Sequence, residues 1–178
     1  PENLPIPVDD GACNHLLGMN IPSVPLGSTA GKIVDLANLT DRTVVYCYPR
    51  TGQPDREPPQ GWNEIPGARG CTPQSCAFKD RYQELQALGV QVYGLSTQDT
   101  AYQREAVERL HLPFELLSDE NLAFANALRL PIFEIESMKL IKRLTLIISN
   151  GQIEKVFYPV FPPDKDAEAV ISWLSQSL

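Results

Sequence analysis

Two cysteines stand five positions apart in the stretch "GARGCTPQSCAFKD", residues 67–80, and a helical pattern follows them directly. Metal-binding pairs and thioredoxin-type redox pairs usually have two residues between the cysteines. Cys71 and Cys76 have four residues between them. The spacing therefore leaves three interpretations open: a structural pair, a metal site, or a reactive thiol with a helper.

Cys71 immediately precedes the expected start of a helix. At that position free N–H groups and the positive end of the helix macrodipole stabilise an anion, which favours the nucleophilic thiolate. The glycines at positions 67 and 70 leave the sulfur reachable from the preceding loop. The alternative interpretation of the same position is a buried, inert cysteine.

Cys76 is expected on the same helix as Cys71. Positions five apart on a helix have Cα atoms roughly 8.5 Å apart and face about 140° away from each other. A disulfide requires Cα atoms within about 7 Å, so the pair cannot bond while this turn is intact. If the two do bond, the turn must unwind. A metal site lacks further ligands, since His15 and His111 are not spaced for one, and we expect no metal.

Two other cysteines and two arginines complete the set of candidates. Cys47 stands mid-strand between two tyrosines and is interpreted as a core residue, and Cys13 receives no role. A thiolate that attacks a polar bond also needs a nearby cation. Arg69 is close in sequence but can simply be solvated in its loop. Arg143 leads a buried strand, which places it at a sheet end or else on the surface.

The surrounding pattern predicts the elements that would position these residues. In the first half of the chain we expect an extended N-terminal arm at 1–30, a short strand and turn at 31–39, a strand at 42–49 ended by Pro49, and an inserted irregular loop at 50–70. A helix should follow from a Thr72 cap and Pro73 to Leu88, then a strand at 90–96 and helices at 99–112 and 118–130. The chain should end with a hairpin at 143–159 turning at Asn150-Gly151 and a helix at 164–178 with Ala169, Val170 and Trp173 inward. This order predicts one thioredoxin-like α/β domain with a central mixed sheet and helices on both faces.

Composition narrows the function classes. The chain of 178 residues with 43% hydrophobic residues can build one core. A net charge of −7 argues against a nucleic-acid surface or an anionic membrane surface, and no apolar run approaches membrane-spanning length. Four irregularly spaced cysteines do not form a disulfide framework, so we expect reduced thiols and a cytoplasmic location.

Four blocks of the chain, in order, resemble the peroxiredoxins of the AhpC/TSA superfamily, and most of all the peroxiredoxin Q or bacterioferritin-comigratory-protein subfamily. The resemblance runs from about residue 22 to the C-terminus. The blocks are "VVYCYPRTG", "GCTPQSCAFKD", "VYGLSTQDTAYQREAVERLHLPFELLSD" and "KRLTLIISNGQI".

The resemblance implies a thioredoxin fold and a thiol-dependent peroxidase without a cofactor. By position, it makes Cys71 the peroxidatic cysteine, Cys76 the resolving cysteine, Arg143 the catalytic arginine and Pro49 the motif proline. The implied partners are a peroxide substrate and a thioredoxin-like or glutaredoxin-like reductant, and the protein would be a monomer or a homodimer.

The chain departs from the resembled family in two places. Ala68 stands where the family has a Thr or Ser whose hydroxyl contacts the peroxide. Pro49 stands 22 residues before Cys71 (71 − 49), which implies an insertion of about 15 residues. Thr51 folding back is the favoured substitute for the missing hydroxyl, with Thr72 or a backbone group as alternatives. Trp62 in the insertion could roof the pocket and select organic peroxides, or simply anchor the loop.

Two other functions remain open. One is a redox sensor on the same fold in which peroxide is turned over weakly. The other is a thiol–disulfide oxidoreductase that acts on proteins, although the Cys-x-x-Cys motif normally used there is missing.

Overall fold

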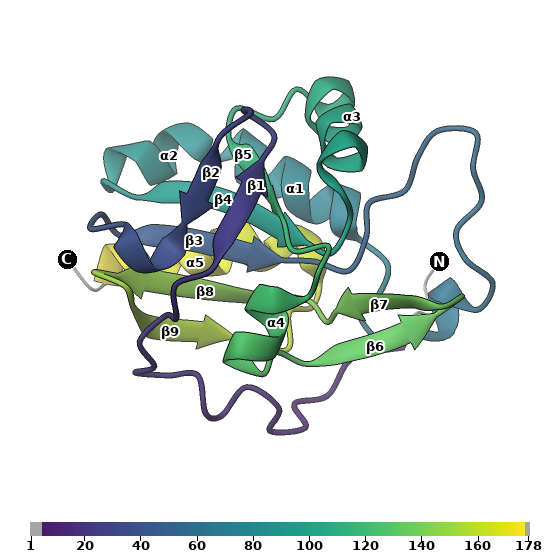
Figure 1. The fold of residues 1–178 in the computed structure, drawn as a ribbon, viewed down its shortest axis with the longest axis horizontal. Helices are drawn as coiled ribbons and strands as arrows, with labels where there is room; N and C mark the ends of the chain where they lie inside the picture. Colours follow the sequence, from purple (N-terminus) through teal and green to yellow (C-terminus); the bar gives the residue numbers. More distant parts are fainter. Residues whose placement is uncertain (1–4, 177–178) are drawn as a thin grey trace.

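A seven-stranded mixed sheet forms the centre of the computed structural model, which describes residues 5–176 (Figure 1). The strands run in the order β2-β1-β5-β4-β3-β8-β9, with β3, β4 and β5 parallel and the other neighbours antiparallel. Their bounds are β1 Pro25–Ser28, β2 Ile33–Asp35, β3 Thr43–Cys47, β4 Gln91–Ser96, β5 Glu115–Ser118, β8 Leu144–Ser149 and β9 Gln152–Phe157. A separate hairpin pairs β6 (Ile132–Ile135) with β7 (Met138–Ile141).

Helices lie on both faces of the sheet, but unequally. One hydrophobic cluster joins the sheet to α1 (Cys71–Asp80), α2 (Tyr82–Ala87), α3 (Thr100–Leu110) and α5 (Asp166–Gln176). The other face is covered by α4 (Ala123–Leu128) and by apolar residues from 13 to 26. Three short 3-10 turns, η1 (Leu36–Asn38), η2 (Trp62–Glu64) and η3 (Pro163–Lys165), complete the described elements. None of the helices within 5–176 is long and apolar enough to cross a membrane.

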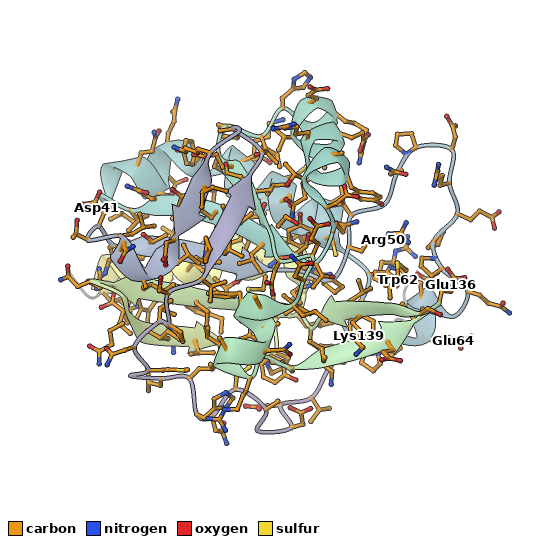
Figure 2. The ribbon with its side chains drawn as sticks, viewed as in Figure 1. Asp41, Arg50, Trp62, Glu64, Glu136 and Lys139 are labelled. Atoms are coloured by element: carbon orange, nitrogen blue, oxygen red, sulfur yellow. The ribbon has the colours of Figure 1, made fainter. Side chains whose placement is uncertain are left out.

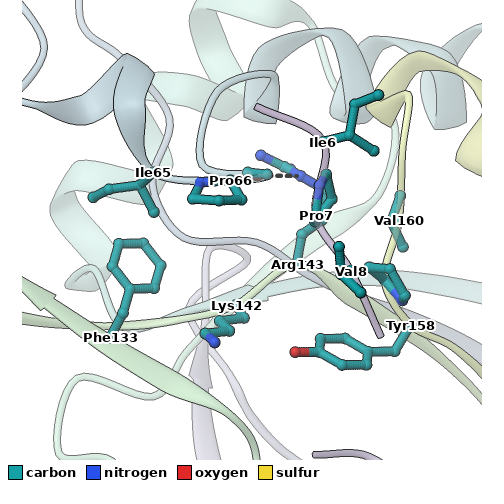
Figure 3. A pocket seen from close by; sticks show the side chains of 12 residues that line it. Ile6, Pro7, Val8, Ile65, Pro66, Phe133, Lys142, Arg143, Tyr158 and Val160 are labelled. Atoms are coloured by element: carbon teal, nitrogen blue, oxygen red, sulfur yellow. Dashed lines mark hydrogen bonds between the residues drawn. The ribbon is translucent and has the colours of Figure 1, made fainter. Parts of the chain in front are cut away.

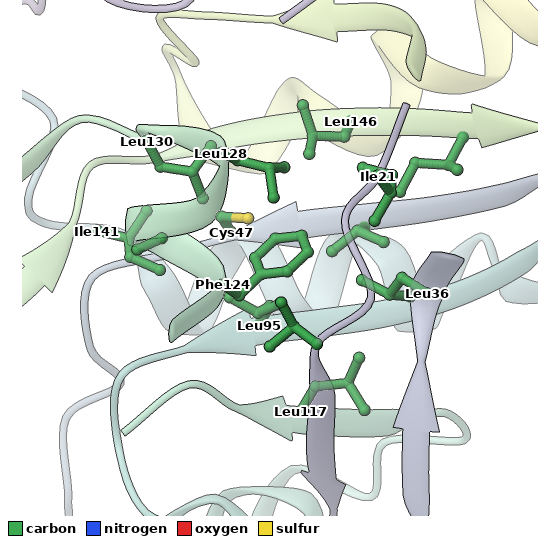
Figure 4. Close-up of a cluster of buried hydrophobic side chains, with 14 of the residues drawn as sticks. Ile21, Leu36, Cys47, Leu95, Leu117, Phe124, Leu128, Leu130, Ile141 and Leu146 are labelled. Atoms are coloured by element: carbon green, nitrogen blue, oxygen red, sulfur yellow. The ribbon is translucent and has the colours of Figure 1, made fainter. Parts of the chain in front are cut away.

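Strand β3 shows why this sheet forms the core. All five of its residues are buried, and alternate side chains enter opposite clusters. Tyr46 stacks on Phe78 of α1 with ring centroids 4.7 Å apart. Cys47 points the other way, beneath Phe124 of α4 (Figure 4). The prediction that Cys47 is a core residue is therefore confirmed.

The prediction of a single helix over 118–130 is wrong at its start. Ser118 ends strand β5, which the sequence pattern did not indicate, and α4 begins only at Ala123. Asp119 nevertheless supports the start of α4 from four residues upstream. Its two carboxylate oxygens accept the N–H groups of Phe124 and Ala125, each at 2.8 Å.

The helix expected from Thr72 to Leu88 also differs. It begins at Cys71 itself, with Gly70 in the N-cap position at φ 112°, and it breaks at Arg81 into α1 and α2. The Thr72 cap is therefore wrong. A glycine reaches this left-handed backbone without strain, so the cap can stand two residues earlier than expected.

The C-terminal helix is confirmed, but its inward face is partly different. Val170 is buried as expected, whereas Ala169 is exposed and Trp173 only half-buried. Ala167 and Leu174 fill the positions next to Val170. Residues 177–178 of the predicted helix, and residues 1–4 of the predicted arm, lie outside the described part of the chain.

The hairpin prediction is confirmed. β8 and β9 turn at Asn150 and Gly151, which have φ of 50° and 73°. The inserted loop at 50–70 contains only the turn η2, and its Trp62 is buried against Phe133 of the β6–β7 hairpin. The insertion is therefore attached to the domain through that hairpin. Of the expected arm, residues 25–28 join the sheet as β1.

Gly70→Ala is expected to lower the free energy of unfolding by about 2–4 kcal/mol. An added Cβ would lie 2.6 Å from Cγ of Pro163 and would have to keep the φ of 112°. Gly52→Ala is the matched control, because nothing lies within 4 Å of its Cβ. Urea unfolding of both variants checks this, and equal stability would contradict the close approach of α1 to η3.

Candidate active site

The sulfur of Cys71 receives two hydrogen-bond donors. Cys71 is the first residue of α1 and is 3% exposed. Nη2 of Arg143 donates to its Sγ at 3.1 Å, and the backbone N–H of Arg50 donates at 3.4 Å. Buried Pro49 leads directly into that amide from the end of β3. Two donors and a helix N-terminus together favour an anionic sulfur.

Arg143 is held in one position by its remaining contacts. It is 4% exposed and directly precedes β8. Nε donates to the carbonyl of Gly67 at 3.2 Å (Figure 3). Nη2 also donates to the carbonyl of Ala68 at 3.0 Å. Nη1 donates to Oε1 of Gln74. The surface interpretation of Arg143 is therefore wrong, because the guanidinium lies against the sulfur inside the protein.

Behind Arg143 lies a buried polar chain that crosses from α1 to α5. Nε2 of Gln74 donates to Oδ2 of Asp166 at 2.8 Å, and Oγ1 of Thr145 donates to the same oxygen at 2.6 Å. Burial raises the pKa of Asp166, while its bonds to Thr145 and Gln74 and the charge of Arg143 oppose that rise. No sequence pattern had indicated Gln74 or Asp166 as site residues. Gln74 could have been suspected from its place three residues after Cys71, one helical turn along.

A cavity of about 470 Å³ opens onto Cys71. Residues 69–73 form one side of it, and Arg50, Gly52, Pro58, Trp62 and Asn63 form the other. Arg50 and Trp62 lie on the side of the molecule where the β6–β7 hairpin projects (Figure 2). Trp62 anchors the loop in an apolar cluster and also lines the cavity, whereas its selection of organic peroxides stays a prediction. Most residues that line this cavity therefore come from the inserted loop at 50–70.

The hydroxyl expected near the peroxide has two possible sources. Ala68 is 1% exposed and packs with Trp62 and Leu140, so its position contributes an apolar contact. Thr72 lines the Cys71 cavity itself. Thr51 lines a smaller neighbouring cavity of about 80 Å³, which shares Arg50, Gly52, Pro58 and Trp62 with the first. Within residues 5–176, the buried Oγ1 of Thr51 finds no hydrogen-bond partner.

Cys76 lies on the intact helix α1 and is half-buried. The two residues before it, Gln74 and Ser75, are fully buried. Oγ of Ser75 accepts a hydrogen bond from the hydroxyl of Tyr46 at 3.0 Å. Both cysteines are free thiols. The turn between them is thus folded and bonded to the rest of the protein, as the helix geometry required of a reduced state.

A third cavity, of about 360 Å³, is lined in part by Arg143 (Figure 3). Its walls are mainly apolar and come from Ile6, Pro7 and Val8 of the arm, from Phe133 of β6 and from the segment after β9. The arm is held beside it by Asp10, which pairs with Lys142 at 3.5 Å and accepts a hydrogen bond from Tyr158. The N-terminal arm therefore passes close to the catalytic arginine expected from the resemblance.

Cys13 and Cys47 are expected to stay unreactive in the folded protein at pH 8. Burial, helped by Asp10, raises the pKa of Cys13 to about 12, and burial raises the pKa of Cys47 well above its usual value. Since the thiolate is the reactive form, iodoacetamide should modify them only after unfolding. Because the unfolded thiols release protons from about pH 8.5, stability should fall as pH rises above that value. Peptide mass spectrometry and thermal unfolding between pH 8 and 11 check both statements, and rapid labelling of Cys13 at pH 8 would contradict them.

Several known proteins are similar to this chain in sequence. The Redoxin family model matches residues 16–171. A putative chloroplastic peroxiredoxin Q of Oryza sativa subsp. indica is 30% identical over 150 residues, 83% of this chain and 61% of the relative. The chloroplastic peroxiredoxin Q of Arabidopsis thaliana is 29% identical over 159 residues, 88% of this chain and 66% of the relative. The chain thus spans somewhat under two thirds of the length of these relatives.

Solved structures of other proteins also share the architecture of this chain. Peroxidoxin BcpB from Mycobacterium tuberculosis superposes with a TM-score of 0.74 at 21% identity, covering 91% of this chain and 98% of that one. A bacterioferritin comigratory protein from Xanthomonas campestris gives 0.69 at 19% identity, covering 98% and 99%. The predicted thioredoxin-like fold, with a mixed sheet between helices, is confirmed.

Proposed function

Because the chain belongs to the Redoxin family, we propose that it is a thiol-dependent peroxidase that reduces hydrogen peroxide or alkyl hydroperoxides through Cys71. One observation carries this proposal. The sulfur of Cys71 lies at the start of a helix, accepts hydrogen bonds from Arg143 and from the Arg50 amide, and faces a cavity. Such a site stabilises a thiolate and presents it to a small electrophile.

The first step is attack of the Cys71 thiolate on the outer oxygen of the hydroperoxide. An S–O bond forms, the O–O bond breaks, and Cys71 becomes a sulfenic acid while the peroxide leaves as an alkoxide or hydroxide that takes up a proton. Negative charge moves from sulfur to the departing oxygen. Arg143, which donates to Sγ, is placed to stabilise both.

The substrate oxygen also needs a hydrogen bond from the protein. A buried hydroxyl without a partner costs about 1–3 kcal/mol, so the Thr51 hydroxyl gains most if a bound peroxide supplies one. Thr72 is the alternative, since it lines the cavity of Cys71. Peroxide turnover of Thr51→Val and Thr72→Val decides between them. The variant that lacks the peroxide-binding hydroxyl should react more slowly than the wild type. If both variants keep the wild-type rate, neither hydroxyl binds the peroxide.

The second step joins the two cysteines. The thiol of Cys76 condenses with the Cys71 sulfenic acid, a disulfide forms and water leaves. Because both residues start on one folded helix, the first turn of α1 must unwind before they meet. A thioredoxin-like or glutaredoxin-like dithiol then reduces this disulfide and is itself oxidised. Such a cycle suits the reducing cytoplasm, and either a monomer or a homodimer could run it.

A redox sensor is the second candidate function. The observation that favours it is the complete burial of Gln74 and Ser75, the residues that must move before Cys76 can react. A sulfenic acid that waits for this movement would persist, which suits a signal better than rapid turnover. The steady-state rate with a dithiol reductant separates the two functions, because a sensor would complete one oxidation and turn over slowly.

Mass spectrometry after one equivalent of hydrogen peroxide tests the proposed cycle. The wild-type protein should contain a disulfide between Cys71 and Cys76, and Cys76→Ser should contain a sulfenic acid at Cys71 that dimedone traps. If Cys76→Ser still forms a disulfide, with Cys13, Cys47 or a second subunit, the resolving role of Cys76 is wrong. If neither protein is oxidised at Cys71, the peroxidase proposal is wrong.

A further inference from the structure

Gln74 lies between the two cysteines of α1, and both ends of its side-chain amide are engaged. Its oxygen accepts from Nη1 of Arg143, and its nitrogen donates to Oδ2 of Asp166 at 2.8 Å. Since a guanidinium only donates, the amide oxygen must face Arg143, which leaves the amide nitrogen for the carboxyl group. The fully buried amide therefore has a single orientation, fixed from two sides.

Asp166 ties the first turn of α1 to two other elements. It is the first residue of α5 and is 3% exposed. Its Oδ2 accepts from Gln74 of α1 and also from Thr145 of β8, at 2.6 Å. The same turn rests on η3, where Gly70 lies against Pro163. The carboxyl group is thus the point at which α1, β8 and α5 are joined.

Unwinding of this turn must break the junction. Gln74 is one of the four residues between Cys71 and Cys76, so it leaves its site when the helix opens for disulfide formation. Its departure would leave Asp166 and Arg143 buried without the amide that lies between them, and buried polar groups without partners are costly. The hydrogen bonds that hold Arg143 beside the sulfur in the first step therefore oppose the second step.

We propose that Asp166 is a positioning residue whose carboxyl group anchors Gln74, keeps the first turn of α1 folded, and so limits the rate at which Cys76 reaches oxidised Cys71. This inference rests on the proposed function, in which Cys71 is oxidised and Cys76 then condenses with it. One residue thereby has opposite effects on the two steps. It supports oxidation of Cys71 through Gln74 and Arg143, and it delays formation of the disulfide.

Asp166→Ala tests the anchor directly. Loss of the buried hydrogen bond from Gln74 should speed disulfide formation about tenfold, and oxidation of Cys71 should become slower. Rapid mixing with hydrogen peroxide, quenching with an alkylating reagent and mass spectrometry measure both steps. Excess peroxide should also give less sulfinic acid at Cys71, because the sulfenic acid is consumed sooner. Asp166→Asn keeps an acceptor oxygen for Gln74 and should restore most of the wild-type ratio of the two rates.

Thr145→Val is a milder second variant in case Asp166→Ala does not fold. It removes one of the two donors to Asp166, and its disulfide formation should also be faster than in the wild type. Thr43→Val is the matched control, since Thr43 is an equally buried strand threonine whose hydroxyl bonds to Asp41 and not to α1 or α5. The control should keep both wild-type rates.

The inference is overturned if Asp166→Ala and Thr145→Val form the disulfide no faster than the wild type. It is also overturned if both variants slow the oxidation of Cys71 and the formation of the disulfide together, as a general loss of the folded protein would. Hydrogen exchange in the reduced protein separates this outcome from failure of the proposed function. The amides of Gln74, Ser75 and Cys76 should exchange faster in Asp166→Ala even if Cys71 does not react with peroxide. Unchanged exchange there would overturn the anchor by itself.

Discussion

Replacing Cys71 by Ser should abolish peroxide turnover, with a loss of at least about 10⁴-fold. A serine hydroxyl is far less acidic than a thiol, so the two donors at this position would face a neutral oxygen that does not attack the O–O bond. The change is nearly isosteric at a residue that is 3% exposed, and the fold should persist. The measurement is peroxide consumption with a dithiol reductant.

Cys13→Ser is the control for this experiment. Cys13 is also a buried thiol, but it lies in the cluster on the opposite face of the sheet, among residues packed against α4. Its variant should consume peroxide at the wild-type rate. Residual turnover in Cys71→Ser above a few per cent would place the reactive thiol elsewhere in the chain.

Arg143→Gln should slow the reaction of Cys71 with hydrogen peroxide by about 10²- to 10³-fold, the usual cost of removing one preorganised donor from a developing charge. The guanidinium donates at once to Sγ, to two loop carbonyls and to Gln74, and no other residue can reproduce this fork. The reaction rate of Arg143→Lys should lie between those of Arg143→Gln and the wild type, since lysine restores the positive charge but not the planar set of donors. Single-turnover rapid mixing gives the rates.

A fair test of Arg143 must separate catalysis from stability. Arg143→Gln leaves the carbonyls of Gly67 and Ala68 short of a donor, which should lower the free energy of unfolding by about 1–3 kcal/mol. Urea unfolding therefore precedes the kinetics. Arg104→Gln on the exposed face of α3 removes a positive charge far from the sulfur and should keep the wild-type rate. A folded Arg143→Gln protein that also reacts at the wild-type rate would remove this residue from the mechanism.

The sequence indicated Cys71 and Arg143 as site candidates, but it did not indicate the residues that hold them in place. Cys71 could be placed at a helix start because a Gly-rich loop and a helical pattern meet there. The resemblance to peroxiredoxin Q, confirmed by the relatives, assigned Arg143 to the same site although it lies 72 positions after Cys71. No local pattern marks Asp166, because its partner Gln74 is 92 positions away and the pairing exists only after folding.

The missed strands and the wrong cap have local causes. β1 reads "PLGS", and its proline and glycine argue against a strand, yet it pairs with β2 on one side and β5 on the other. Thr72 and Pro73 form a favourable helix start by type, which indicated a cap two residues too late. The left-handed Gly70 allows α1 to begin at Cys71, so the sulfur itself occupies the first helical position.

Rapid mixing of the reduced protein with hydrogen peroxide, with the free Cys71 thiol followed over time, tests the account most directly. The geometry of the sulfur, Arg143 and the Arg50 amide predicts a fast loss of one thiol per chain, at a rate far above that of free cysteine. Running an alkyl hydroperoxide beside it would show whether the cavity lined by Trp62 prefers a larger substrate. A Cys71 thiol that reacts no faster than free cysteine would contradict the proposed peroxidase.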